Sequence, residues 1–159
     1  MLVYYLFSTL YFVLSGVNKL EFEEVLTVHV KIENTIEMKS DNVDDVLMIL
    51  FNGSADGKYF KGEVLTGGID TQIIGKFGDN HTLSARYMLE GKDYTGESCK
   101  IFIENNGNLN RKYKDILFRT YPKIITDSKA LEFLNNDVLV GEGIGTESGV
   151  DIKIYRAVQ

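Results

Sequence analysis

The sequence is poor in the residues that cross-link small domains or hold metals. Its 159 residues include one cysteine, two histidines, one proline and no tryptophan. The lone Cys99 excludes an internal disulfide, and with only His29 and His81 beside it the common Cys/His zinc frameworks are excluded as well. Positive charge is also scarce, because 17 Lys and Arg residues stand against 23 Asp and Glu residues, for a net charge of -6. A negative chain repels phosphate backbones and anionic lipid heads, which argues against nucleic acid and membrane partners.

Motifs of several common enzyme classes are missing too. The chain has no G-x-S-x-G elbow, no H-E-x-x-H pair and no G-x-x-x-x-G-K phosphate loop. Residues 141–146 look superficially like a dinucleotide loop, but the last position is Thr146 and no helix follows to bind a phosphate. We therefore predict no cofactor and no metal site, and we interpret the acidic cluster of Asp41, Asp44 and Asp45 as a solvated turn.

The length fits one domain with one core, and the first residues differ from the rest. Residues 1–17 carry no charged side chain and contain an apolar run that resembles the core of a signal peptide. No basic residue precedes that run, and it is shorter than the roughly 20 residues that span a membrane. We interpret residues 1–18 as a hydrophobic N-terminal extension, packed on the domain or lying upstream of it. Residues 19–159 form the domain, and we predict a cytoplasmic protein, with export as the disfavoured alternative.

Alternation of apolar and polar residues dominates from residue 19 onward. In residues 21–32 one face of a predicted strand is apolar, with Phe22, Leu26, Val28, Val30 and Ile32. The pattern recurs, between turns, at residues 46–51, 59–65, 69–77, 81–90, 99–105, 116–125, 138–144 and 150–158. Such spacing without long helices predicts an all-β fold, a single antiparallel β-barrel of about 8 to 10 strands. One short helix is expected near residues 127–135, capped by Asp127 or Ser128.

Polar side chains interrupt two neighbouring predicted strands. Asp70 and Gln72 share one face of the first, and Ser84 and Arg86 share one face of the second. If residues 78–80 connect the strands, Gln72 lies opposite Arg86 with Asp70 beside them, and a carboxylate, an amide and a guanidinium converge. A turn of two residues would place Gln72 and Arg86 on opposite faces, and an exposed ion pair on the outer wall is the alternative.

The chain resembles the domain of unknown function 3237 family, which is uncharacterised and mainly bacterial. The resemblance is carried by Gly67-Gly68-Ile69-Asp70-Thr71-Gln72, Leu83-Ser84-Ala85-Arg86-Tyr87, residues 101–107, 118–122, 133–135 and 138–141, in family order. Thr71 and Phe133 stand where the family tends to have tryptophan, which implies a changed pocket if those tryptophans line it. The resemblance implies a compact β-barrel and no established activity.

The resemblance also supplies candidate site residues, which match the family position by position: Asp70, Gln72, Arg86, Asn105, Arg119 and Asn135. Their types suit a small polar or anionic ligand, with Tyr87 as an amphipathic wall. The alternative is structural: Asn105 and Asn135 then satisfy backbone groups at turns, and Arg119 ties loops together.

The sequence is compatible with three functions. The leading hypothesis is a small-molecule-binding barrel with a polar pocket, in which Gln72, Tyr87, Asn105, Arg119 and Asn135 bind the ligand. An enzyme without a cofactor would use Asp70 as general acid or base and Arg86 or Arg119 against developing negative charge, as in an isomerisation or cyclisation. An interaction protein would instead pair its edge strands in a homodimer, with the N-terminal extension as a hydrophobic surface.

Overall fold

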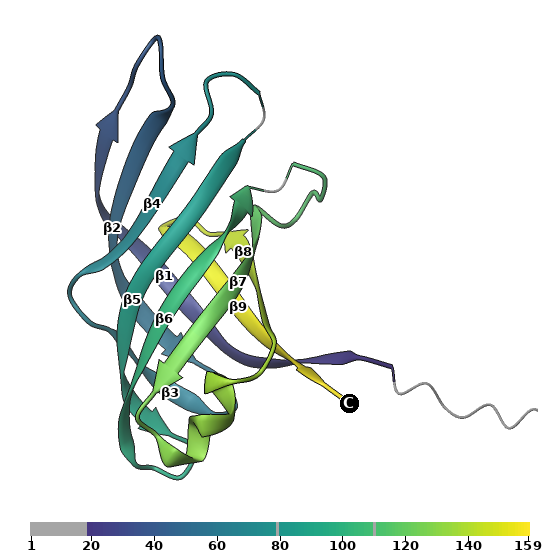
Figure 1. The fold of residues 1–159 in the computed structure, drawn as a ribbon. Coiled ribbons are helices and arrows are strands. Elements are labelled where there is room, and N and C mark those ends of the chain that lie inside the picture. Colours follow the sequence, from purple (N-terminus) through teal and green to yellow (C-terminus); the bar gives the residue numbers. More distant parts are fainter. Residues whose placement is uncertain (1–18, 79, 110) are drawn as a thin grey trace, which may run out of the picture.

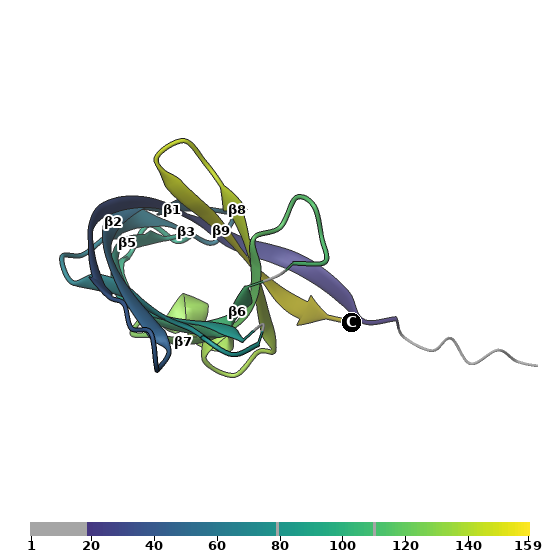
Figure 2. The same cartoon turned by 90° about the horizontal axis from the view of Figure 1, so that it is seen from above.

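The computed structural model describes residues 19–78, 80–109 and 111–159. Its antiparallel strands form one sheet that closes into a ring, which is seen end-on in Figure 2. The strands are β1 (Glu21–Met38), β2 (Asp45–Asp56), β3 (Phe60–Val64), β4 (Gly68–Ile74), β5 (His81–Asp93), β6 (Ser98–Leu109), β7 (Phe118–Thr126), β8 (Leu139–Gly145) and β9 (Gly149–Val158). One 3-10 helix, η1 (Lys129–Asn135), is present in these residues. The predicted all-β antiparallel barrel with a short helix is confirmed.

The ring closes through the pairing of β1 with β2, and β3 and β4 share one position in it. Both pair with β2 on one side and with β5 on the other, β3 near one end of the barrel and β4 near the other. Between them the chain bends at Gly67, whose φ of 109° lies in the left-handed region that other residues rarely adopt. The result is a barrel with about eight positions around its axis, a size at which the interior holds side chains or one small ligand.

The lower part of the barrel, next to η1 in Figure 1, is packed with apolar side chains. The fully buried residues there include Leu26, Leu89, Ile101, Ile103, Ile124 and Ile154. The η1 helix presses Leu131 and Leu134 against this core, and Ser128 caps it by accepting a hydrogen bond from the Leu131 amide. Because this end is filled, any interior space lies towards the opposite end.

The first half of β1 differs from the sequence prediction at Phe22. A bulge between Glu24 and Leu26 buries Val25 and Leu26 in succession and reverses which residues face inward before it. Phe22, predicted on the core face, is therefore 51% exposed on the outer wall. The predicted alternation is correct from Leu26 to Val30.

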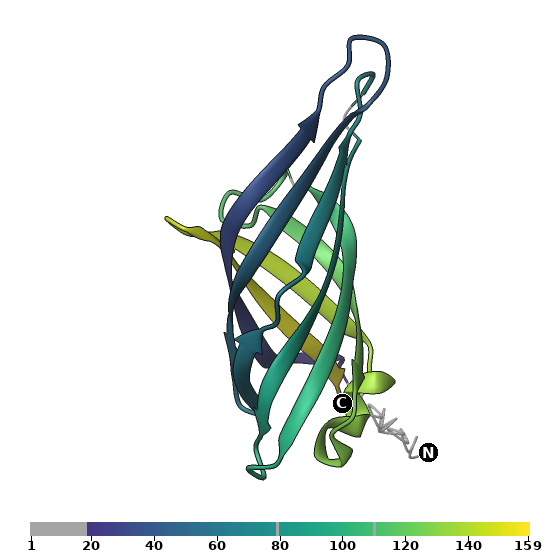
Figure 3. The same ribbon diagram turned by 90° about the vertical axis from the view of Figure 1, so that its left-hand side faces the viewer.

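At the upper end the strands differ in length. β1 and β2 extend beyond their neighbours as a projecting hairpin, as Figure 3 shows. In the described part of the chain, no helix is long and apolar enough to cross a membrane. The expectations for residues 1–18 lie outside the described residues.

Candidate functional site

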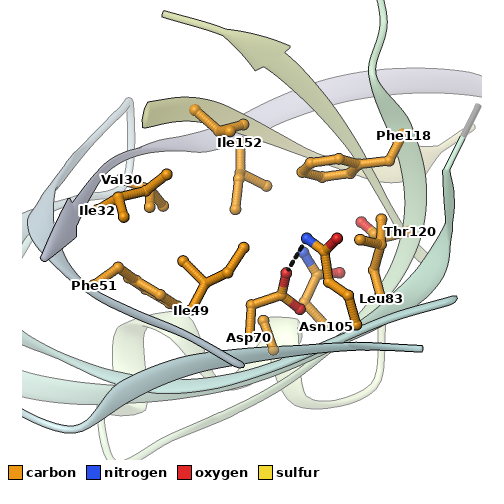
Figure 4. Close-up of a pocket in the computed structure, with 13 residues that line it drawn as sticks. Val30, Ile32, Ile49, Phe51, Asp70, Leu83, Asn105, Phe118, Thr120 and Ile152 are labelled. Atoms are coloured by element: carbon orange, nitrogen blue, oxygen red, sulfur yellow. Dashed lines mark hydrogen bonds between the residues drawn. The ribbon is translucent and has the colours of Figure 1, made fainter. Parts of the chain in front are cut away.

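A cavity occupies the upper half of the barrel, above the packed core. Strands from most of the ring contribute to it, and its lining is mainly apolar: Val30, Ile32, Ile49, Phe51, Asp70, Gln72, Leu83, Ala85, Asn105, Phe118, Thr120, Val150 and Ile152. In Figure 4 the polar residues Asp70, Asn105 and Thr120 lie along one side, with Val30, Ile32 and Ile152 along the other. The cavity volume is about 70 Å³, and the figure is about 520 Å³ when the spaces between atoms and the open mouth are counted as well. This arrangement of an apolar chamber with a polar wall is typical of ligand sites.

Asp70 is the carboxyl group of the polar wall. It lies on β4 and faces inward, because its partners Ile49 on β2 and Ala85 on β5 also face inward. Burial raises the pKa of Asp70 above its usual value, while hydrogen bonds from the Gln72 side chain and the Ser84 amide act in the other direction. Asp70 Oδ2 accepts from Gln72 Nε2 at 2.8 Å, and Oδ1 accepts from the Ser84 N–H at 3.1 Å. Both oxygens are thus held in place by hydrogen bonds, and burial is a larger influence on the pKa of Asp70 than either of these bonds.

Gln72 connects the Asp70 carboxylate to His81, the first residue of β5. Because the carboxylate requires a donor, the amide nitrogen of Gln72 points to Asp70 and its oxygen points to His81. His81 Nε2 therefore donates to Gln72 Oε1, at 2.7 Å. Burial lowers the pKa of His81, with the nearby charge of Arg111 acting in the same direction. The chain of contacts fixes the orientation of three polar side chains at the cavity.

Asn105 and Thr120 complete the polar wall from β6 and β7. Both are only 2% exposed, and Asn105 Oδ1 and Thr120 Oγ1 find no hydrogen-bond partner in the described part of the protein. Leaving such a group unpaired costs about 1–3 kcal/mol. These two atoms are therefore the strongest structural indication that the cavity receives a polar group.

The predicted convergence of Arg86 with Asp70 and Gln72 is wrong. The strands pair so that Ile69 lies opposite Arg86 and Gln72 opposite Leu83. Arg86 consequently faces outward, 55% exposed, and its Nε donates to Glu104 at 3.1 Å. The alternative weighed from the sequence, an ion pair on the outer wall, describes Arg86, although its partner is Glu104 and not Asp70.

Two other predicted ligand-binding residues also lie away from the cavity. Arg119 is on the outer wall, where it donates to Glu142 at 3.0 Å and stacks over the Tyr113 ring. Asn135 ends η1, and its Oδ1 accepts a hydrogen bond from the Thr126 amide. Both agree with the structural alternative: Asn135 satisfies a backbone N–H group, and Arg119 links neighbouring segments of the outer wall.

Tyr87 is buried below the cavity, and it does not line it. Its ring packs edge-on against Phe51 with centroids 5.4 Å apart, and burial raises its pKa. Its hydroxyl group has no partner among the described residues. The two positions where the family tends to have tryptophan do not line the cavity either, since Thr71 alternates with the inward-facing residues of β4 and Phe133 lies in η1, where it packs against Tyr59.

Thr120 is a cavity residue that the sequence analysis did not identify, although the pattern of its strand could have indicated it. It alternates with Phe118 and Pro122 on the inward face of its strand, where a lone hydroxyl among apolar neighbours marks a polar site. His81 is not among the site residues predicted from the sequence, although its ring contacts Gln72 beside the cavity. No group of three or more His, Cys, Asp and Glu side chains in the described ranges could hold a metal ion.

Comparison with known proteins gives the family and the fold. A family model described as "Protein of unknown function (DUF3237)" matches residues 20–157. A curated protein of Clostridium acetobutylicum, described as a UPF0311 protein, is 27% identical over 159 residues, which covers 90% of this chain and 98% of that protein.

Solved structures agree with the barrel. A crystal structure of a protein with unknown function from Clostridium acetobutylicum matches with a TM-score of 0.75 and 27% identity, over 90% of this chain and 100% of that one. A β-barrel-like protein from Acinetobacter baumannii matches with a TM-score of 0.68 and 19% identity, over 88% and 97%. The second likeness shows the fold alone.

Proposed function

This chain belongs to the DUF3237 family of proteins of unknown function, and we propose that it binds a small molecule in the upper cavity of its barrel. The observation that carries the proposal is the pair of buried, unpartnered atoms Asn105 Oδ1 and Thr120 Oγ1 in that cavity. A ligand donor reaching these atoms would remove a cost of about 1–3 kcal/mol for each. The apolar opposite wall would bury the rest of the ligand.

The lining chemistry narrows the kind of ligand. The described residues around the cavity include no Lys or Arg, and Asp70 is their one titratable side chain. Asp70 and Asn105 offer oxygen acceptors, and the Thr120 hydroxyl both accepts and donates. The cavity therefore suits a mostly apolar, uncharged molecule that carries hydroxyl or amide N–H donors. Of the polar or anionic ligands expected from the sequence, an anion is disfavoured because both candidate arginines lie on the outer wall.

Binding is tested with purified protein and a library of neutral small molecules, by native mass spectrometry and thermal shift. A true ligand raises the melting temperature by mass action. Thr120→Val and Asn105→Leu should each lower the affinity for that ligand at least about 10-fold, and a tenfold change in affinity corresponds to about 1.4 kcal/mol. Arg86→Ala and Arg119→Ala are the matched controls and should bind normally. An equal loss of affinity in the two arginine variants would contradict a binding site in the interior.

The position of Asp70 supports a second candidate, an enzyme that needs no cofactor. A carboxyl group whose pKa is raised by burial, and whose oxygens are held by Gln72 and Ser84, suits a general acid or base. Asp70→Asn separates the two candidates once a ligand is known. An enzyme would lose turnover while affinity changes little, whereas a binding protein would show no turnover before or after the change.

A further inference from the structure

An apolar surface covers the outer wall of the barrel where the chain enters β1. It spans four strands that are successive neighbours in the ring, namely β1, β9, β8 and β7. We call it the entry face, and its side chains are Leu20, Phe22, Tyr121, Val138, Val140 and Tyr155. Four of them are more than half exposed, at 53% for Leu20, 51% for Phe22, 72% for Tyr121 and 67% for Val138. Contiguous exposed apolar surface of this kind commonly marks a contact site.

The entry face is hollowed where β7 and β8 separate. These strands pair only between Phe118–Thr120 and Gly141–Gly143. Beyond that point a groove opens, and its walls include Phe22, Tyr121, Val140 and Tyr155. Its floor includes Thr120, the same buried side chain that reaches the interior cavity. A groove with aromatic walls can receive apolar side chains, which a flat surface would leave half exposed.

Paired charges lie in the groove of the entry face and beside it, since Arg119 and Glu142 are among the residues that line the groove. Arg119 on β7 pairs with Glu142 on β8 at 3.0 Å, and Lys153 on β9 lies 3.9 Å from Glu24 on β1. These pairs satisfy one another across neighbouring strands, so they leave no excess charge. These two pairs therefore add no net charge to the groove, which fits an uncharged occupant.

We propose that residues 2–14 of this same chain cover the entry face. The face begins at Leu20 and Phe22, so the preceding residues start beside it. Residues 1–17 hold no charged side chain, and 2–14 include Leu2, Val3, Tyr4, Tyr5, Leu6, Phe7, Leu10, Tyr11, Phe12, Val13 and Leu14. Six extended residues reach about 20 Å, enough to cross four strands spaced about 4.8 Å apart. Leu14 can therefore reach any strand of the face.

The proposal is tested by photo-cross-linking in the full chain. A benzophenone amino acid replaces Tyr121, the protein is irradiated, and tryptic peptides are mapped by mass spectrometry. Because Lys19 is the first Lys or Arg, residues 1–19 form one tryptic peptide, and position 121 lies in the peptide of residues 120–123. We expect these two peptides to be joined within protein of monomer mass. The same probe at Ile36, 52% exposed at the far end of β1, is the control and should not join residues 1–19.

Other occupants would give different products. Cross-links to residues 1–19 at dimer mass, or to another part of a second copy, would overturn the proposal in favour of an interface between copies. Cross-links to lipid when vesicles are added, with none to residues 1–19, would overturn it in favour of a bilayer. Absence of any cross-link would also overturn it, provided that the same probe at Val138, which is 67% exposed, gives the same result.

A charge placed in the face gives an independent measurement. Val140→Lys should lower the yield of the monomer cross-link from position 138 at least about 5-fold and speed proteolysis within residues 1–18. Ile36→Lys is the matched control on the same outer surface and should change neither. An unchanged yield in folded Val140→Lys protein would contradict packing on the entry face.

Discussion

The side-chain amide of Gln72 donates a 2.8 Å hydrogen bond to Asp70 Oδ2, two residues away on the same strand and on the same inward face. This contact places a donor beside a carboxyl group that burial alone would strongly disfavour in its charged form. The other end of the amide accepts from His81. The protonation state of Asp70 therefore depends on a neighbour that itself lines the cavity.

Replacing Gln72 with leucine should raise the pKa of Asp70 further. The Gln72 hydrogen bond is the largest influence that lowers this pKa, so its removal leaves burial less opposed. The measurement is an NMR titration of the Asp70 carboxyl carbon in both proteins. Thr71→Val, on the opposite face of β4, is the control and should leave the titration unchanged. A pKa of Asp70 that stays constant or falls in Gln72→Leu would contradict the arrangement.

Asp70→Asn should flatten part of the pH dependence of stability in the acid range. The folded pKa of Asp70 is raised above its usual value of 3.8, so the folded state binds the proton more tightly than the unfolded state. The stability that this provides is present below about pH 3.8 and is lost as pH rises through the folded pKa. In urea unfolding from pH 3 to 8, the free energy of unfolding of the variant should increase relative to that of the wild type as pH rises. The opposite trend would show that the charged form of Asp70 is the favoured one.

Thr120→Val should stabilise the free protein by about 1 kcal/mol while it weakens ligand binding. The substitution keeps the shape of the side chain and removes a buried hydroxyl group that has no partner among the described residues. Thr126→Val on the same strand is the matched control. Thr126 Oγ1 donates to the Lys100 carbonyl, so its loss should destabilise the fold. Chemical denaturation distinguishes the two, and a large loss of stability in Thr120→Val would show that its hydroxyl is already satisfied.

His29 should make stability fall with rising pH near neutrality. Its ring contacts Asp151 at 2.8 Å, and chiefly this hydrogen bond raises its pKa above 6.5. The contribution is present below about pH 6.5 and is lost as pH rises through the folded pKa. His29→Gln should remove this slope. His81→Gln is the contrasting control, because the pKa of His81 is lowered and its effect on the slope has the opposite sign.

Ser128→Ala should destabilise the lower end of the barrel by about 1–3 kcal/mol. Its hydroxyl accepts from the Leu131 amide at the start of η1 and donates to Asp93 Oδ2 at 2.6 Å. Ser98→Ala, at an exposed position, is the control and should stay within about 0.5 kcal/mol of the wild type. Equal stability of the two variants in urea unfolding would show that η1 is held by its apolar side chains alone.

The turn between β4 and β5 explains why the site was only partly predicted. The sequence offers glycine, aspartate and asparagine at residues 78–80, which suggested a short connection with Phe77 opposite His81. In the structure Ile74 pairs with His81, and the Gly75 amide donates to the Asn80 carbonyl across a longer turn. The shift of three residues moves Arg86 out of register with Gln72, and because side chains alternate it lies on the other face.

By itself the sequence determined which side chains share a face along a regular strand such as β4, because alternation along an extended chain is a local property. It correctly grouped Asp70 with Gln72 and separated them from Ile69 and Thr71. The tertiary structure decided which of those faces meet, since strand register depends on pairing with β2, on the bulge in β1 and on closure of the ring. That is why Asp70, Asn105 and Thr120, which lie far apart in the chain, share one chamber while Arg86 and Arg119 remain outside it.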